Sequence, residues 1–446
     1  MVAATPERVV NRPRSYLRLP ARNVELGLLL LALGITTAGF AAVQLARAQA
    51  FDTAPLMAAA LFASAYLIAH LVVRATLPDA DSFVLPITAV LTSLGLIEIY
   101  RIDAALARDQ GLWILIGLGL FIAVVIAFRD IRQLESLRYT CAAAAVLLLL
   151  LTIVVGTEVN GARLWIRVAG FQIQPGEFAK ILLVVFLAAY LRERREVLAE
   201  PVRRIAGIGI PALRHALPLL ILAGAALVLL VAMNDLGSSL LFYVIALAMI
   251  YVATGRLLYV ASGLGLFALG SLVALRIAPQ MQGRIDGWLN PWPDEQAQCC
   301  YQITQSLYTI ADGGVLGAGF GRGLILNDAG GTIIPYAQTD FIYSVIANEM
   351  GLLGAAGVIL LYLLLAWRGF RIATTADDGF SKLLATGLAT AVAFQVFVIV
   401  GGIVRLLPLT GLTLPFVSYG GSSVTANFAI AALLLCISQR ANRERL

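Results

Sequence analysis

Long apolar stretches, separated by mostly short polar connections, follow one another along almost the whole chain. Each stretch has about 20 residues, the length that an α-helix needs to cross roughly 30 Å of bilayer hydrocarbon. The pattern predicts an all-α protein, a polytopic transmembrane helix bundle of about twelve spans. The predicted spans are 24–45, 55–75, 83–100, 112–128, 137–155, 176–192, 215–233, 236–253, 257–276, 341–366, 381–403 and 418–438.

Composition supports a membrane protein. The chain has 446 residues, of which 60% are hydrophobic and only 13% are charged, whereas about 25% of the residues of a soluble domain are charged. This chain cannot cover itself with polar surface. The net charge of +6 therefore indicates membrane topology and attraction to anionic lipid, and no nucleic-acid partner is expected.

The distribution of Lys and Arg predicts the orientation, because short positively charged loops stay on the cytoplasmic side. An N-terminus inside the cell places most cationic connections on that side. The residues concerned are Arg8, Arg12, Arg14, Arg18, Arg22, Arg129, Arg132, Arg138, the cluster from Arg192 to Arg214, Arg440, Arg443 and Arg445. We therefore expect a multi-pass protein of the cytoplasmic (inner) membrane with both termini in the cytoplasm.

One connection is long. Residues 277–340 form an outer, extracytoplasmic loop of about 64 residues, and long loops in compact proteins are usually functional or disordered. Its aromatic residues favour an ordered cap at the membrane interface. They include Trp288, Trp292, Tyr301, Tyr308, Phe320 and Tyr336.

Two polar stretches have simple structural interpretations. The glycine-rich segment GGVLGAGFGRG at 313–323 lacks the preceding strand of a nucleotide-binding loop, so we expect flexible turns between short interfacial helices. Asn234 or Asp235 lies between two spans that are barely separated and is expected to cap a tight turn. No metal-binding motif is present, and the adjacent Cys299 and Cys300 cannot complete a zinc site by themselves.

Charged residues at membrane depth are costly and therefore informative. Glu177 and Lys180 lie three residues apart, so they share a helix face and can pair. They form either a structural ion pair between two helices or a contact for a polar lipid head group. Glu349 lies in an apolar span and is expected to face the protein interior or a water-filled groove, because exposure to lipid is prohibitive.

Several motifs, in a fixed order, resemble those of the SEDS family (FtsW/RodA/SpoVE) from about residue 83 to residue 438. Each motif alone is weak, and their order is the strong signal. The motifs are NGARLWIRVAGFQIQPGEFAK at 160–180, MNDLGSSLLF at 233–242, RIDGWLNPWPD at 284–294, YQITQS at 301–306, TDFIYSVIANEMG at 339–351 and LPLTGLTLPFVSYGGSS at 407–423.

The resemblance implies a peptidoglycan glycosyltransferase that polymerises lipid II at the outer membrane face, for cell elongation or division. The donor would be a growing undecaprenyl-pyrophosphate glycan, and the acceptor a lipid II hydroxyl. Two alternatives stay open. The chain could be a lipid II flippase or transporter, or a non-catalytic scaffold for a penicillin-binding protein.

The resemblance also implies the site. The outer-loop aspartate that is essential in the family matches Asp294, the expected general base of an inverting transfer. The leaving pyrophosphate needs positive charge, and Arg163 and Arg284 match family positions that would supply it. Lys180 lies nearby in the motif, and Arg405 is a further candidate. The remaining candidate substrate contacts are Glu177, Tyr301, Gln302, Gln305, Ser306 and Glu349.

The sequence departs from the family pattern directly after Asp294. Relatives commonly have glycines there, whereas this chain reads EQAQCCYQ at 295–302 and is one residue longer. Glu295 is therefore an alternative carboxylate. No resident cofactor is expected, and assistance by a divalent cation stays open.

The family core has ten helices, so residues 1–80 are expected to add a basic N-terminus and two extra helices to a core at 81–446. This arrangement resembles actinobacterial RodA-type members. The resemblance further implies a class B penicillin-binding protein as partner.

Overall fold

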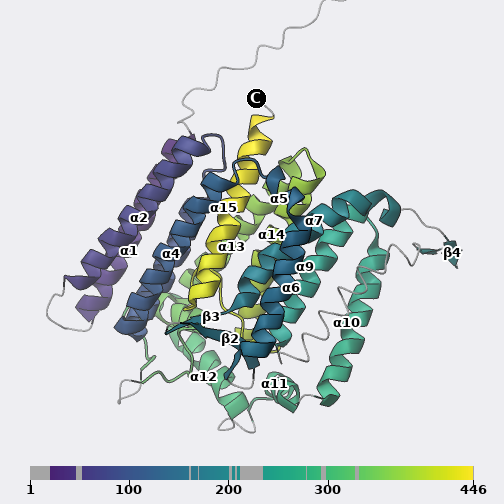
Figure 1. The fold of residues 1–446 in the computed structure, drawn as a ribbon. Coiled ribbons are helices and arrows are strands. Elements are labelled where there is room, and N and C mark those ends of the chain that lie inside the picture. The colour runs from purple at the N-terminus through teal and green to yellow at the C-terminus, as the bar shows by residue number, and fades with distance from the viewer. Residues whose placement is uncertain are drawn as a thin grey trace, which may run out of the picture.

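The computed structural model shows a bundle of long helices that lie side by side (Figure 1). It describes residues 21–46, 53–159, 162–168, 170–199, 203–205, 208–210, 235–277, 279–292, 298–326 and 331–444. We call the end of the bundle with β2 (Ala162–Val168), β3 (Phe171–Ile173), α11 (Pro279–Leu289) and α12 (Gln298–Gly313) the loop end. The opposite end, where α1 (Ala21–Ala46) begins and α15 (Gly421–Arg443) ends, is the terminal end.

Helices dominate the described chain. They are α1 (Ala21–Ala46), α2 (Ala54–Thr76), α3 (Val84–Ile102), α4 (Ala104–Ala127), α5 (Arg132–Ser136), α6 (Arg138–Val155), α7 (Pro175–Ala199), α9 (Leu236–Thr254), α10 (Leu257–Ile277), α11 (Pro279–Leu289), α12 (Gln298–Gly313), α13 (Ile342–Thr375), α14 (Gly379–Ile403) and α15 (Gly421–Arg443). The predicted all-α polytopic bundle is confirmed.

Nine of the described helices are long and apolar enough to cross a membrane: α1, α2, α3, α4, α6, α9, α13, α14 and α15. A shorter apolar helix covers Leu257–Val273. The predicted span 176–192 forms the first part of α7, whose later residues carry a cluster of charges. The predicted span 215–233 lies outside the described residues, so the exact number of spans stays a prediction.

The central helix of the bundle is α15. Its apolar stretch is entirely buried, and α4 packs along it. Small residues allow the close approach that helix packing in membranes requires. A Cβ on Gly117 of α4 would lie 2.5 Å from the Phe428 ring of α15. The packing of α4 against α15 therefore requires a residue without a side chain at position 117.

The two N-terminal helices pack on α3 through polar as well as aromatic contacts. Thr36 of α1 and Ser93 of α3 lie 2.5 Å apart through their hydroxyl oxygens. The Tyr66 hydroxyl of α2 lies 2.7 Å from the Thr92 hydroxyl. Such interhelical hydrogen bonds hold helices together where lipid gives no hydrophobic driving force.

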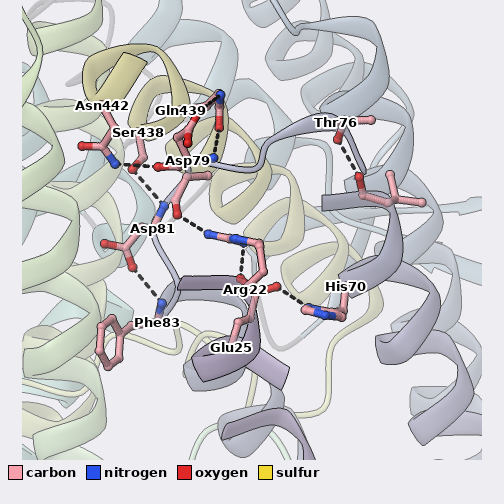
Figure 2. A network of polar contacts seen from close by, with 12 residues as sticks. Arg22, Glu25, His70, Thr76, Asp79, Asp81, Phe83, Ser438, Gln439 and Asn442 are labelled. Atoms are coloured by element: carbon pink, nitrogen blue, oxygen red, sulfur yellow. Dashed lines mark hydrogen bonds and ion pairs between the residues drawn. The ribbon is translucent and has the colours of Figure 1, made fainter. Parts of the chain in front are cut away.

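At the terminal end, a polar network joins these two helices to each other and to the following segment (Figure 2). The Arg22 guanidinium pairs with Glu25 and donates to the carbonyl of Ala80. Glu25 Oε1 lies 2.7 Å from His70 Nδ1 on α2. All three charged or titratable side chains are buried, so the network satisfies groups that would be costly alone.

The same network continues into α15 and α13. Asp79 and Asp81 lie in the connection between α2 and α3, and Gln439 Oε1 accepts from the Asp79 amide at 2.7 Å. Ser438 Oγ accepts from the Asp81 amide at 3.0 Å. Asp81 also receives the Arg368 guanidinium of α13, whose Nε lies 2.7 Å from Oδ2. The connection is therefore fixed on two other helices.

Asp81→Ala is expected to lower the free energy of unfolding by about 3 kcal/mol, because it leaves a mostly buried guanidinium unpaired. Denaturant unfolding of the purified protein in detergent measures the loss. Asp130→Ala is the matched control, since the Asp130 side chain is 60% exposed and its contact with Arg440 is 3.5 Å long; it should cost less than about 1 kcal/mol. Equal losses for both variants would contradict this role of Asp81.

Two small sheets interrupt the helical pattern. The sheet at the loop end contains β1 (Thr157–Val159), β2 (Ala162–Val168) and β3 (Phe171–Ile173) in antiparallel order. The other contains β4 (Arg203–Ile205) and β5 (Ile208–Ile210). Neither sheet was predicted from the sequence. In β2 the exposed Arg163 and Arg167 alternate with the buried Ile166, a period of two that was available in the sequence.

The turns expected in the glycine-rich segment 313–323 are present, and they fill a break in α13. Gly351 interrupts the helix with φ 66° and ψ −170°. The loop takes up the freed backbone groups: the amide of Gly319 donates to Glu349 O at 2.8 Å, and Leu352 donates to Gly314 O at 2.9 Å. Irregular backbone at membrane depth requires such partners.

Glycine is required at this contact by the close approach of two backbones. Gly317 has φ 81°, and a Cβ there would lie 2.2 Å from the carbonyl oxygen of Glu349. A Cβ on Gly351 would lie 2.3 Å from the Gly317 nitrogen. The glycines therefore serve packing, and the loop fixes the end of α12 against α13.

Candidate functional site

A cavity of about 490 Å³ opens at the loop end among α11, α12 and the segments before α13 and after α14. Its lining combines charged, aromatic and small residues. The polar and aromatic members are Arg284, Trp288, Gln302, Tyr336, Asp340 and Arg405. A cavity of this size with a few converging polar groups is typical of a ligand site.

Arg405 holds α11 in place. Its Nε donates to the carbonyl of Trp288 and its Nη2 to the carbonyl of Leu289, both at 2.7 Å. These carbonyls belong to the last turn of α11, where a cation complements the helix dipole. The Trp288 indole in turn donates to Arg405 O at 3.2 Å. The Arg405 guanidinium is therefore committed to positioning this helix.

Arg284 is the cation of the cavity that is open to a ligand. It is half-buried on α11, and its hydrogen bond to Thr410 O is long, at 3.5 Å. Arg284 belongs to none of the ion pairs in the described part of the chain. A planar guanidinium in this situation suits phosphate oxygens.

Asp340 supplies a carboxylate to the same cavity. Desolvation raises the pKa of Asp340 to about 6, although a hydrogen bond from Thr339 and the charge of Arg284 act in the opposite direction. Its main chain is fixed, since the Asp340 amide donates to Tyr336 O at 3.1 Å. The carboxylate can therefore change its charge near neutral pH.

Asp235 lies close to this region and has a structural role. Its Oδ1 accepts from the Ser238 amide at 3.1 Å and caps α9, which confirms the predicted cap. Burial raises the pKa of Asp235, against the lowering effects of Ser238 and Arg284. Arg284 thus lies within electrostatic reach of two carboxylates, Asp235 and Asp340.

The four residues predicted on one face of α12 divide between the cavity and the core. Gln302 lines the cavity. Ser306, one turn further, is fully buried, and its hydroxyl lies 2.7 Å from that of Ser344 on α13. Tyr301 and Gln305 are half-buried and are absent from the cavity lining.

Lys180 and Glu177 form a buried ion pair away from the cavity. Lys180 Nζ donates to Glu177 Oε2 and to Gln395 Oε1 on α14, both at 2.8 Å. Gln395 Nε2 donates to the carbonyl of Thr413. The ion pair lies within α7, and the hydrogen bond from Lys180 to Gln395 ties it to α14, which fits the structural alternative considered from the sequence.

Two further candidates also lie outside the cavity lining. Arg163 is on β2 with a side chain 56% exposed, and its Nε lies 3.4 Å from Glu158 Oε2. Glu349 is buried as expected, accepting from the Gly321 amide at 2.8 Å and from Arg101 Nε at 3.2 Å. Glu349 thereby fixes the glycine-rich loop to α13 and α3.

Asp294 and Glu295 lie outside the described residues. The described residue before them, Trp292, has its ring 6.0 Å from the Arg405 guanidinium and 6.0 Å from the Tyr308 ring. The helices on either side of this segment, α11 and α12, both line the cavity.

The structure places Arg284, Gln302 and Arg405 in the lining of one cavity, and their substrate contacts and outer position stay predictions. Sequence reasoning did not select Asp340 or Tyr336. The sequence could have indicated Asp340, because this residue belongs to the TDFIYSVIANEMG motif and lies directly before a predicted span.

Comparison with known proteins gives consistent results. The family model described as cell cycle protein, FtsW/RodA/SpoVE, matches residues 80–443. Peptidoglycan glycosyltransferase RodA of Mycobacterium tuberculosis is 39% identical over 435 residues, covering 95% of this chain and 91% of that protein. Stage V sporulation protein E of Bacillus subtilis is 32% identical over 371 residues, covering 80% of this chain and 97% of that protein.

Solved structures show the same relationship. A chain from the structure described as "Structural coordination of polymerization and crosslinking by a peptidoglycan synthase complex" is 31% identical with a TM-score of 0.66, covering 81% of this chain and 98% of that one. The rod shape determining protein RodA of Thermus thermophilus is 31% identical with a TM-score of 0.58, covering 82% and 97%.

Proposed function

This chain belongs to the FtsW/RodA/SpoVE family of cell cycle proteins, and from that membership we propose how its loop-end cavity works as a peptidoglycan glycosyltransferase. The identity of 39% with a protein of that name, over most of both chains, supports the activity. The observation that carries the proposal is the cavity itself, where Arg284 and Asp340 face one space without forming an ion pair with each other.

The substrates are lipid II and the growing undecaprenyl-pyrophosphate glycan. A lipid II hydroxyl attacks the anomeric carbon of the donor, and the pyrophosphate leaves. Because an α-linked donor gives a β-linked product, a base must remove the proton of the hydroxyl as it attacks. We assign this role to Asp294. The positions of α11 and α12 on both sides of its segment support the assignment.

Arg284 is proposed to bind the pyrophosphate. Preorganised cations stabilise the charge that develops on a leaving group, and Arg405 keeps α11, which carries Arg284, in position. Arg163, Glu177 and Lys180, together with the α12 residues, remain proposed substrate contacts of lesser weight. A divalent cation that assists the pyrophosphate remains compatible with the site.

We further propose that the loop end faces outward. The terminal end carries Arg368, Arg371, Arg440 and Arg443, and positive residues favour the cytoplasmic side. Residues 1–80 are proposed as a two-helix addition to a core at 81–446, which includes the outer loop 277–340. The family match beginning at residue 80 supports this division.

A class B penicillin-binding protein is the proposed partner, since one similar chain comes from a complex described as coordinating polymerization and crosslinking. The higher identity with RodA than with the sporulation protein or FtsW, 39% against 32%, favours elongation over division.

The purified protein with its partner is expected to convert fluorescent lipid II into glycan chains, seen as a ladder on a gel that muramidase digests. A scaffold without activity would give no ladder, whatever partner is present. That result would overturn the proposed function.

A further inference from the structure

The carboxylate of Asp340 is a feature of the cavity to which neither the motifs nor the relatives' names give a role. It faces a space bordered by Arg284 from α11, Gln302 from α12 and Arg405 from the end of α14. In the described chain Asp340 takes part in no ion pair. Thr339 donates one hydrogen bond to this carboxylate, and a carboxylate can accept several, so acceptor capacity remains for a ligand in the cavity.

The backbone that carries Asp340 is held firmly. The Tyr419 amide donates to Gln338 O at 2.8 Å, and Ser418 Oγ donates to Thr339 O at 2.5 Å. Phe341, the next residue, is fully buried. Residues 338–341 are thus attached to the segment before α15, and the Asp340 side chain starts from a fixed point, as a preorganised site requires.

We propose that Asp340 binds the acceptor sugar, by accepting a hydrogen bond from a sugar hydroxyl or from the N–H of an N-acetyl group. The inference rests on the proposed function and adds a residue that contacts the acceptor rather than the donor. A carboxylate makes strong hydrogen bonds to such neutral donors. It would repel the anionic pyrophosphate of the donor, which Arg284 attracts.

The ionised form of Asp340 is the one that accepts hydrogen bonds without competition from its own proton. With a pKa of about 6, this form is lost as the pH falls below about 6. The other charged or titratable groups of the cavity lining are Arg284, Arg405 and Tyr336, and none of these side-chain types normally changes charge between pH 5 and 8. Burial also raises the pKa of Asp235, which lies within reach of the same Arg284, and the proposed base Asp294 must itself be ionised. The part of the acid limb that Asp340→Asn removes is therefore the part that reports Asp340.

The test is a steady-state assay in which a lipid-linked tetrasaccharide is the donor and lipid II is the acceptor, each varied while the other is saturating. Asp340→Asn is expected to raise KM for the acceptor about tenfold or more while changing KM for the donor less than about twofold. Below pH 6, the wild type should lose kcat/KM for the acceptor, and the variant should not show that loss.

Asp312→Asn is the matched control, because Asp312 is exposed at the end of α12 and absent from the cavity lining; it should behave as wild type. Asp340→Glu keeps the carboxylate and should recover part of the acceptor affinity, which a purely structural role of Asp340 would not predict. If Asp340→Asn raises KM for the donor and leaves the acceptor KM unchanged, the inference is wrong. An unchanged acid limb in Asp340→Asn also overturns it. Failure of the wild type to polymerise would instead overturn the proposed function.

Discussion

Asp294→Ala is expected to lower the rate of glycan polymerisation by about 10³-fold, since it removes the proposed general base. In an inverting transfer the acceptor hydroxyl must lose its proton as it attacks, and alanine offers no group to take it. Pro291 and Pro293 restrict the chain before this residue, which would help to hold the base in place. The initial rate with labelled lipid II, at matched protein concentration, measures the effect.

Two other acidic residues, Glu295 and Asp312, provide the controls for Asp294. Glu295→Ala tests the adjacent carboxylate and should retain most of the activity. Asp312→Ala removes an exposed carboxylate on α12 and should match the wild type. If Glu295→Ala is inactive while Asp294→Ala polymerises lipid II normally, the base is Glu295 and our assignment is wrong.

Arg284→Ala is expected to lower kcat/KM by about 10- to 100-fold, because a hydrogen bond to a charged group contributes roughly 1.5–3 kcal/mol. The guanidinium lines the cavity, and its hydrogen bond to Thr410 is long, so we expect its loss to affect the cavity more than the fold. Arg284→Lys keeps the charge but loses the forked geometry, so its kcat/KM should lie between those of the wild type and Arg284→Ala. Steady-state polymerisation assays give all three values.

The matched control for Arg284 is Arg163→Ala. Arg163 belongs to the same family resemblance, but it is on β2, its side chain is 56% exposed and it pairs with Glu158. Its loss should lower kcat/KM only a few-fold. A larger effect for Arg163 than for Arg284 would show that the pyrophosphate binds near β2 rather than in the cavity.

Hydrophobicity predicted most of the fold because the bilayer restricts what can cross it. The break in α13 was not predictable in this way. Nothing local to Gly351 or to the glycine-rich loop shows that the two backbones meet, since their contact depends on how α12 and α13 pack. The sheet β1–β3 was not predicted for another reason. The alternation of exposed and buried residues around Arg163 is only a few residues long, whereas the long apolar stretches on both sides predict helices.

The site was predictable only where a motif carried it. Arg284 and Gln302 follow from the family resemblance, and both line the cavity. The role of Arg405 depends on Trp288, which lies 117 residues away in the sequence. Asp340 was overlooked because its motif continues into an apolar span, and its place in the cavity depends on the segment around Ser418.

We propose that this chain joins sugars at its loop end and does not move their lipid carrier across the membrane. Proteoliposomes that hold the protein and its partner, with labelled lipid II added only to the leaflet at the loop end, separate these two activities. Glycosyl transfer predicts glycan chains on that face and no faster exchange of lipid II between leaflets than in protein-free vesicles. Rapid exchange of lipid II without any glycan would contradict it.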